Sequence, residues 1–453
     1  MNIFSFVYLA VFLLAGFCIA RRALPQAGLS VSIPLGCGFG VSLLAFVPAC
    51  FAVVLGFRLP ALLLAAAVVA ALAVWLARHG TPFTRVPDPD AAALWACVLP
   101  LAVVTLYLLH THVLHLVDGS YHTGQSCYGD MAMHLGFIKN IAVTGKLPPV
   151  YPLLGGEHRF GYPFLCETVS SVFLVLGADA RTAYLLPMLA AFISVYGMMW
   201  QLARQVLGSA GKACLAFWLF FMGSGFGFVY FLGSAEAFAG IFTGFYTTPT
   251  NYTAENIVWV NPIVDLLIPQ RATLFGWCVL FPALYLVWRF CMEEETRLWR
   301  YLALLVLPLP LMHTHSALAL VLICLACGAS CTTWGSARRP SERRIVASWQ
   351  THWRGSWRAD APGKQEDGAI AMIHDFTLVY ALSPELNSQD EVMHRLAGSD
   401  CADATVGWGR PGHVALAFSR EAMDCNAAVA LAVAQMRQVL LGASLVRTEA
   451  ASP

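Results

Sequence analysis

The sequence predicts a mainly α-helical membrane protein: a polytopic transmembrane bundle of about nine to ten spans with a large external loop, followed by a small C-terminal α+β domain. Three observations support this fold class. The chain is 58% hydrophobic and only 12% charged, whereas an ordinary soluble domain has roughly 25% charged residues. Residues 1–333 carry 28 of the 53 charged side chains, and the last 120 residues carry the other 25. Long apolar runs fill only the first, charge-poor part.

An apolar run of about 20 residues is long enough to cross a bilayer as a helix. One weaker stretch, 163–177, is short and carries Glu167, so we expect a re-entrant or interfacial helix there. The first run lacks a basic start and a small-residue cleavage site, which predicts a retained helix and not a signal peptide. Nine runs qualify as spans: 2–20, 31–55, 59–77, 91–110, 183–203, 213–232, 272–290, 301–313 and 316–332.

The basic residues between these runs predict the orientation, because Lys and Arg are retained on the cytoplasmic side. The loops that carry the basic residues all fall on one side of the membrane if 163–177 does not cross it. The N-terminus is then outside and the C-terminal tail inside. Two large loops, about 111–182 and 233–271, are then external. Eight of the nine histidines in residues 1–333 fall on or near this outer side, which predicts an external polar site.

Charge and cysteine usage exclude other classes. The net charge of +1 gives no reason to expect a polyanion, so no nucleic-acid partner is predicted. Most of the 14 cysteines lie inside apolar runs, where a thiol behaves as a small hydrophobic group. A disulfide scaffold is therefore not expected.

The first external loop contains the strongest candidate residues. Gly129-Asp130 opens a helical pattern, and Asp130 and His134 are four residues apart, which places them on one helix face. A carboxylate and an imidazole in this arrangement can bind a metal ion together or transfer a proton. Asp130 could equally serve as the cap of the helix.

Further candidates follow along the two loops. His158 and Arg159 lie in a Gly-, Pro- and aromatic-rich stretch, which is functional or an interfacial anchor. Arg271 begins a span and is expected to face outward, where it binds a phosphate or carboxylate or reaches the lipid headgroups. His313 and His315 separate two spans at the outer face. Imidazoles at membrane depth are usually functional, and the alternative is a hydrogen bond from one of them to a neighbouring helix.

Several segments together resemble one superfamily: GDMAMHLGFIKNIAVTGKLPPVYPLLGGEHRFGYPFL, GSGFGFVYF, PQRATLFG and LPLPLMHTHSALAL. An acidic residue near a helix start in the first large external loop, followed by an amphipathic helix and a Pro-rich turn, is similar to GT-C membrane glycosyltransferases. The similarity is strongest to a poorly characterised bacterial branch and covers about residues 120–332.

The resemblance implies transfer of a sugar from a polyprenyl-phosphate donor to a glycan or lipid acceptor, at the outer face of a bacterial cytoplasmic (inner) membrane. Asp130 matches the loop aspartate that acts as base or metal ligand, and His134 follows it in the pattern. Arg159 or Arg271 would stabilise the leaving lipid phosphate. His158, His313 and His315 would belong to the same substrate-binding region. The resemblance assigns no definite cofactor. A divalent metal ion bound by Asp130 and His134 is an open alternative.

Two departures keep other functions open. Asp130 lacks the adjacent acidic partner frequent in the superfamily, and the chain has no further spans after Ser330. An inactive, truncated transferase with a regulatory cytoplasmic module is therefore one alternative. A membrane transporter or channel-like protein is the other, although no internal repeat of the kind found in transporters is visible.

The sequence as a whole predicts three regions. These are a transmembrane domain at 1–333, a basic linker at 334–372 and a small cytoplasmic α+β domain at 373–450. Within the small domain we expect strands at 376–382, 404–408, 413–418 and 444–447, and helices at 389–397 and 426–440. This βαββαβ order suggests a split βαβ, ferredoxin-like fold. The domain has no nucleophile–base pair, so a binding or regulatory role is expected.

Overall fold

The computed structural model of the chain divides into two compact units, Met1–Trp357 and Arg358–Pro453. Each unit is described by itself. Most of the expected linker, 337–371, lies outside the described residues. The structure describes residues 3–79, 86–124, 127–152, 158, 160–223, 229, 232–240, 251–252, 257–258, 260–293, 295–336, 372–382, 388–397, 399, 401, 403–408, 412–422, 425–440 and 442–450.

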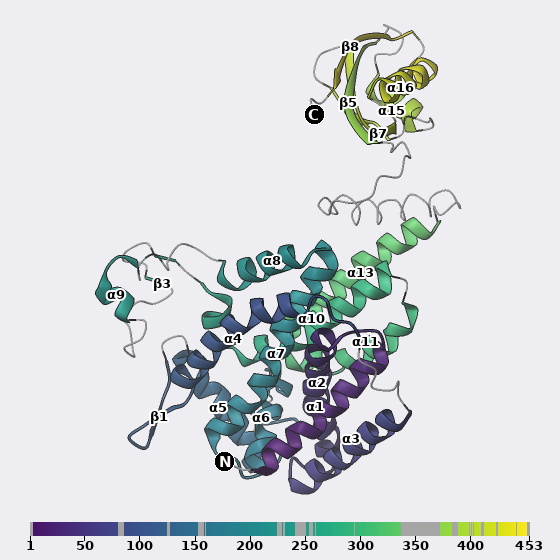
Figure 1. Cartoon of the computed structure of the whole chain (residues 1–453). Helices are drawn as coiled ribbons and strands as arrows, with labels where there is room; N and C mark the ends of the chain where they lie inside the picture. Colours follow the sequence, from purple (N-terminus) through teal and green to yellow (C-terminus); the bar gives the residue numbers. More distant parts are fainter. Residues whose placement is uncertain are drawn as a thin grey trace. The chain divides into compact units, whose positions relative to one another are not determined.

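The first unit is a helical bundle (Figure 1). Among the described residues, six of its helices are long and apolar enough to cross a membrane, which indicates a membrane protein. These helices coincide with six of the nine expected spans. They are α1 (Ile3–Ala23), α2 (Leu29–Leu55), α3 (Leu59–His79), α4 (Ala91–His112), α7 (Ala180–Leu207) and α10 (Arg271–Met292).

Shorter elements connect and fill the bundle. Two antiparallel pairs of short strands, β1 (His115–Val117) with β2 (Ser120–His122) and β3 (Asn251–Tyr252) with β4 (Ile257–Val258), accompany them. A π-helical turn spans Pro262–Leu267, and a 3₁₀ turn spans Thr296–Leu298. The shorter helices are α5 (Tyr128–Thr144), α6 (Leu165–Val175), α8 (Ala210–Met222), α9 (Ala235–Gly240), α11 (Trp299–Val306), α12 (Leu309–Met312) and α13 (Thr314–Ser336).

Two expected spans differ from the helices found in the described part of the chain, where six helices qualify as spans against the nine to ten predicted. The segment 213–232 forms a helix only to Met222, because Gly223 follows it and glycine disfavours helix. The segment 301–313 is divided into α11 and α12 at Pro308, which has no amide hydrogen to continue the helix. The expected span 316–332 lies within α13, a helix of 23 residues whose described apolar part is Thr314–Cys327.

The weak apolar stretch 163–177 contains α6, which has 11 residues and is too short to cross a bilayer. Every residue from Leu165 to Phe173 is buried. The expectation that this segment does not cross the membrane fits its length, and whether it is re-entrant or interfacial stays a prediction. Helix α6 lies inside the bundle and contacts α2, α5, α7, α10 and α12.

Glycine and hydroxyl groups join the helices at close range. Helix α1 packs along α2 (Figure 1), where a Cβ atom on Gly16 would lie 2.2 Å from the Gly36 carbonyl oxygen and 2.4 Å from the Gly40 nitrogen. Gly36 and Gly40 form a small-xxx-small pair, a pattern that brings membrane helices close together. The Ser194 hydroxyl of α7 donates to the Cys278 carbonyl of α10 at 3.0 Å, and these helices also contact α2.

The second unit contains a small sheet with the strand order β6-β7-β5-β8, in which all neighbouring strands are antiparallel. Its elements follow the order βαββαβ. Alternate residues of β5 and β7, among them Leu378 and Leu416, form a buried core with the two helices. The elements are β5 (Met372–Ala381), α15 (Gln389–Ala397), β6 (Thr405–Gly407), β7 (His413–Ala422), α16 (Cys425–Val439) and β8 (Ser444–Ala450).

Candidate functional site

A row of ionisable side chains lies inside the bundle where α5, α6 and α10 meet. His134 of α5 is 1% exposed, and Glu167 of α6 and Arg271 of α10 are fully buried. His134 Nδ1 lies 2.6 Å from Glu167 Oε1, and Arg271 Nε lies 3.4 Å from Glu167 Oε2. The carboxylate therefore binds an imidazole with one oxygen and faces a guanidinium with the other. We call His134, Glu167 and Arg271 the buried ionic row.

Arg271 is enclosed by polar and aromatic groups. Its guanidinium donates to the Tyr184 carbonyl at 3.1 Å and to the Ser170 hydroxyl at 2.5 Å. The guanidinium carbon also lies 4.1 Å from the centre of the Tyr184 ring and 5.1 Å from that of Phe275, within the range of cation–π attraction. The expectation that Arg271 faces outward is wrong: the residue is fully buried, and the carboxylate it meets belongs to Glu167 of the same chain.

The sequence of α6 explains how the row forms. Glu167, Ser170 and Ser171 are spaced at i, i+3 and i+4, so they form one polar face of the helix. The Ser171 hydroxyl donates to the Ile138 carbonyl of α5 at 3.0 Å, while Glu167 binds His134 one turn earlier on α5. Polar groups buried in this way need partners, and these contacts fix α6 against α5.

Asp130 lies one turn before His134, in the first turn of α5, as the sequence predicts. It is half-buried, and it forms no hydrogen bond or ion pair with any described residue. Burial raises the pKa of the Tyr162 phenol, and the nearby Cys166, Glu167 and Asp130 side chains raise it further by electrostatic repulsion. Asp130 therefore lies close to Tyr162. Tyr162 therefore stays protonated and can donate a hydrogen bond. Asp130 is the more accessible end of a line of ionisable groups that continues inward into the buried ionic row.

Aromatic residues cover this side of α5. The Phe137 ring lies 4.6 Å from the Phe160 ring and 5.6 Å from those of Tyr151 and Tyr162, measured between ring centres. The Tyr162 ring in turn lies 6.2 Å from the His134 imidazole. Tyr151, Phe160 and Tyr162 of the Gly-, Pro- and aromatic-rich stretch thus pack over the part of α5 that carries His134 and Phe137.

The remaining predicted residues lie apart from the row in the described contacts. His158 is exposed, and Arg159 lies outside the described residues. His313 is half-buried, its Nδ1 lies 2.7 Å from the Ser316 hydroxyl, and its ring lies 5.5 Å from that of exposed His315. His313 also packs against α10, because a Cβ atom on Gly276 would lie 2.5 Å from it. Of the predicted residues that the structure describes, His134 and Arg271 both meet Glu167, and Asp130 lies one turn from His134 on α5.

Glu167 is the residue that sequence reasoning missed as a site residue. It was noted only as a reason to doubt a span at 163–177. A lone carboxylate in an apolar stretch is itself a signal, because ionisable residues at membrane depth are costly and usually functional. Its partners could not be found from the sequence, since 33 residues separate it from His134 and more than 100 from Arg271.

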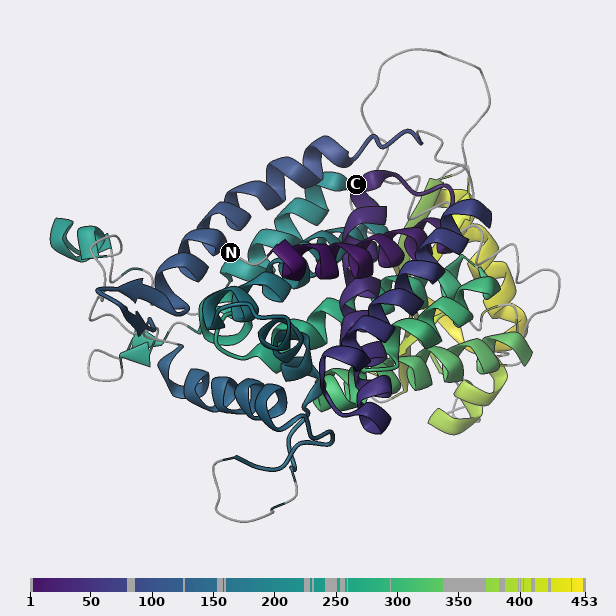
Figure 2. The same ribbon diagram turned by 90° about the horizontal axis from the view of Figure 1, so that it is seen from below.

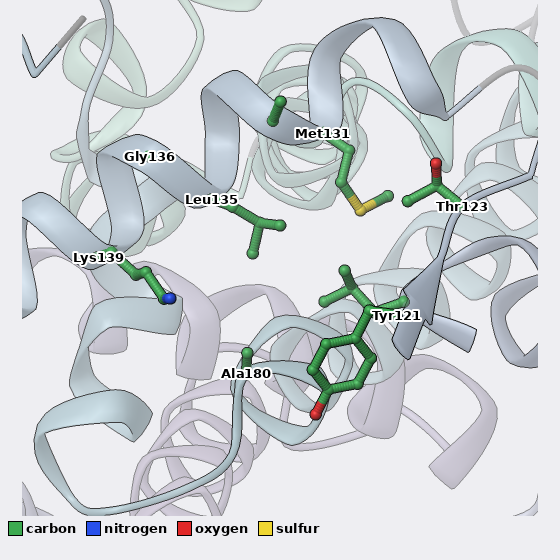
Figure 3. Close-up of a pocket in the computed structure, with 9 residues that line it drawn as sticks. Tyr121, Thr123, Met131, Leu135, Gly136, Lys139 and Ala180 are labelled. Atoms are coloured by element: carbon green, nitrogen blue, oxygen red, sulfur yellow. The ribbon is translucent and has the colours of Figure 1, made fainter. Parts of the chain in front are cut away.

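A cavity of about 350 Å³ lies on the other side of α5 (Figure 3). Met131, Leu135 and Lys139 of α5 lie on one side of it, and Tyr121 lies across from them. Tyr121 belongs to the β1–β2 hairpin, which projects from the end of α4 (Figure 2). Asp130 and His134 are not among the residues that line this cavity.

Among the residues that the structure describes, no three His, Cys, Asp or Glu side chains lie close enough together to bind a metal ion. The fold and the site together define a membrane protein with a helical bundle and ionisable groups buried inside it. No protein-family model matches the sequence, and it is similar to no curated protein and to no solved structure found by comparison.

Proposed function

We propose that the chain is an integral-membrane glycosyltransferase of the GT-C type, which moves a sugar from a polyprenyl-phosphate donor to a hydroxyl acceptor on a glycan or lipid. The observation that carries the proposal is the state of Asp130. It is a half-buried carboxylate with no partner among the described residues, at the start of a helix that continues into the buried ionic row. A general base has to be unpaired and within reach of its substrate.

In this mechanism Asp130 accepts the proton of the acceptor hydroxyl. The oxygen forms a bond to the anomeric carbon, and the bond from that carbon to the donor phosphate breaks. The lipid phosphate leaves with the electron pair, and the sugar is transferred with inversion. Arg271 is not available to the leaving phosphate, because its guanidinium is enclosed by Glu167, Ser170 and Tyr184. Arg159 keeps the role of phosphate-binding residue in the proposal.

The same proposal covers location and the second unit. The transferase would lie in the inner membrane of a bacterium with Asp130 on the outer side. The second unit would be a cytoplasmic, ferredoxin-like regulatory module, which is supported by its βαββαβ order and its sheet order β6-β7-β5-β8.

Replacing Asp130 by Asn is expected to lower sugar transfer by about 10²–10⁴-fold, the usual contribution of a general base. The measurement is transfer of radiolabelled sugar from polyprenyl-phosphate donors in membranes that contain equal amounts of folded protein. Asp118→Asn is the matched control, because Asp118 lies at the tip of the exposed β1–β2 hairpin and should leave transfer unchanged. Equal transfer by Asp130→Asn and the control would remove Asp130 from the mechanism.

The buried ionic row favours a second candidate function, proton-coupled transport. Chains of Asp, Glu and His inside membrane bundles form the proton paths of many transporters. In proteoliposomes, a transporter would take up solute when a pH gradient is imposed, and the Glu167→Gln variant would lose this coupling. Such uptake, in a protein that transfers no sugar from any donor, would replace the transferase proposal.

A further inference from the structure

The bond between His134 and Glu167 determines which nitrogen of the imidazole is occupied. His134 Nδ1 lies 2.6 Å from Glu167 Oε1, and both side chains are buried. A carboxylate can only accept at this distance, so Nδ1 carries a hydrogen and donates it. In the neutral ring the other nitrogen, Nε2, is then a proton acceptor. Glu167 therefore holds the imidazole in one tautomer and one orientation.

His134 is also placed toward Asp130. The two residues are one turn apart on the same face of α5, and side chains of a helix lean toward its N-terminus. The imidazole thus leans toward the turn that begins with the half-buried carboxylate. The Tyr162 ring lies 6.2 Å from the imidazole and near Asp130, so it closes this side of the space.

Arg271 lies at the other oxygen of the Glu167 carboxylate. The guanidinium is 3.4 Å from Glu167 Oε2, and Ser170 and the rings of Tyr184 and Phe275 hold the guanidinium in place. Glu167 is therefore held from both sides, with Oε1 at the imidazole and Oε2 at the guanidinium.

We infer that Glu167 and Arg271 are positioning residues, and that through them His134 Nε2 receives the proton that Asp130 has taken from the acceptor hydroxyl. This inference rests on the proposed function. The proton passes from the acceptor oxygen to the Asp130 carboxylate and then to His134 Nε2. The resulting imidazolium lies against the Glu167 carboxylate, and after the product leaves its proton passes back through the more accessible Asp130 carboxyl to water. Asp130 is thereby restored as a base for the next turnover.

The first test reads the imidazole directly and needs no activity. The protein is labelled with ¹⁵N-histidine in detergent micelles, and the His134 signals are assigned by their loss in His134→Gln. We expect the neutral ring of the unmodified protein to carry its proton on Nδ1. We expect Glu167→Gln to give a mixture of tautomers, and the control Glu295→Gln, which alters a carboxylate paired with Arg289 and Arg297, to leave the signals unchanged. A proton on Nε2 in the unmodified protein overturns the inference.

The second test is the pH dependence of sugar transfer, and it separates a role in proton transfer from a structural one. Asp130, Tyr162, Cys166, Glu167, Tyr184 and Arg271 are the titratable or charged groups whose effects meet around His134. We expect Glu167→Gln to lower kcat by about 10-fold or more with KM unchanged. We also expect the acidic limb of the rate profile to move to lower pH, because the imidazolium has lost the carboxylate that stabilises it.

Glu167→Asp provides the rescue variant, since it keeps the negative charge with a shorter side chain and should return the acidic limb toward its original position. Transfer by Glu167→Gln with unchanged kcat and unchanged pH profile overturns the inference alone and leaves the proposed function standing. If the unmodified protein transfers no sugar, the proton relay falls together with the proposed function, even where the tautomer is the one expected.

Discussion

Replacing Arg271 by Met is expected to lower the free energy of unfolding by about 3–5 kcal/mol, the usual cost of removing one partner of a buried ion pair. Arg271 is fully buried, and its loss would leave the buried Glu167 carboxylate without its guanidinium partner, beside the imidazole and the Cys166 thiol. Methionine fills much of the same space without charge, so the loss reflects the unpaired carboxylate more than a cavity. The measurement is reversible unfolding of the purified protein in mixed micelles.

The matched control is Arg289→Met near the other end of the same helix. Arg289 pairs with Glu293 and Glu295, but its side chain is 22% exposed. A partly exposed pair contributes roughly 0–1 kcal/mol, so the two substitutions should differ severalfold in cost. A loss for Arg271→Met no greater than that for Arg289→Met would contradict the burial of an ion pair at the centre of the bundle.

A double substitution extends this result. Glu167→Leu combined with Arg271→Met removes both charges, and an apolar pair in place of a buried ion pair is often neutral or stabilising. The double variant should therefore be more stable than Arg271→Met alone, although His134 then loses its acceptor. If it folds well but has lost function, the row is present for its chemistry and not for stability.

This comparison explains why the row is informative about function. Leu or Met at position 167 could be buried at no electrostatic cost, since the other residues from Leu165 to Phe173 are buried without charge. The chain instead places a carboxylate, an imidazole and a guanidinium there. Ionisable groups inside membrane proteins that stabilise little are usually retained for proton or substrate chemistry.

The sequence predicts those parts of the fold that depend on local composition. The six long apolar helices and the helix that carries Asp130 and His134 begin within a few residues of their expected positions, because apolar length and helical spacing are local properties. The breaks at Gly223 and Pro308 were missed, since the apolar runs continue across both residues. Helix-breaking residues outweigh hydropathy at such points.

The candidate site is less predictable because its contacts join distant segments. Arg271 begins a helix, and that position alone favours a surface location, but the packing of α6 against α10 encloses it. The i, i+4 pair of Asp130 and His134 could be identified from spacing. The partner of His134 could not, because nothing local to residue 134 indicates a carboxylate on α6.

Replacing Gly16 by Ala is expected to lower the free energy of unfolding by about 3 kcal/mol, at the upper end of the usual cost of overpacking a core. The new Cβ would lie 2.2 Å from the Gly36 carbonyl oxygen and 2.4 Å from the Gly40 nitrogen. Both are backbone atoms, so no side chain can turn away and α1 has to move from α2. The same measurement of reversible unfolding in micelles determines the loss.

Gly211→Ala in α8 is the control that should change stability in the opposite direction. Its Cβ would meet only the Ser209 hydroxyl at 4.0 Å, and alanine is favoured over glycine in a helix by roughly 0.5–1 kcal/mol. The two substitutions add the same methyl group to a helical glycine, so their difference isolates the α1–α2 contact. Equal stability of Gly16→Ala and Gly211→Ala would mean that α1 and α2 do not cross at this distance. Helices α1 and α2 would then be packed farther apart, and the glycines at positions 36 and 40 would not be needed for close contact with Gly16.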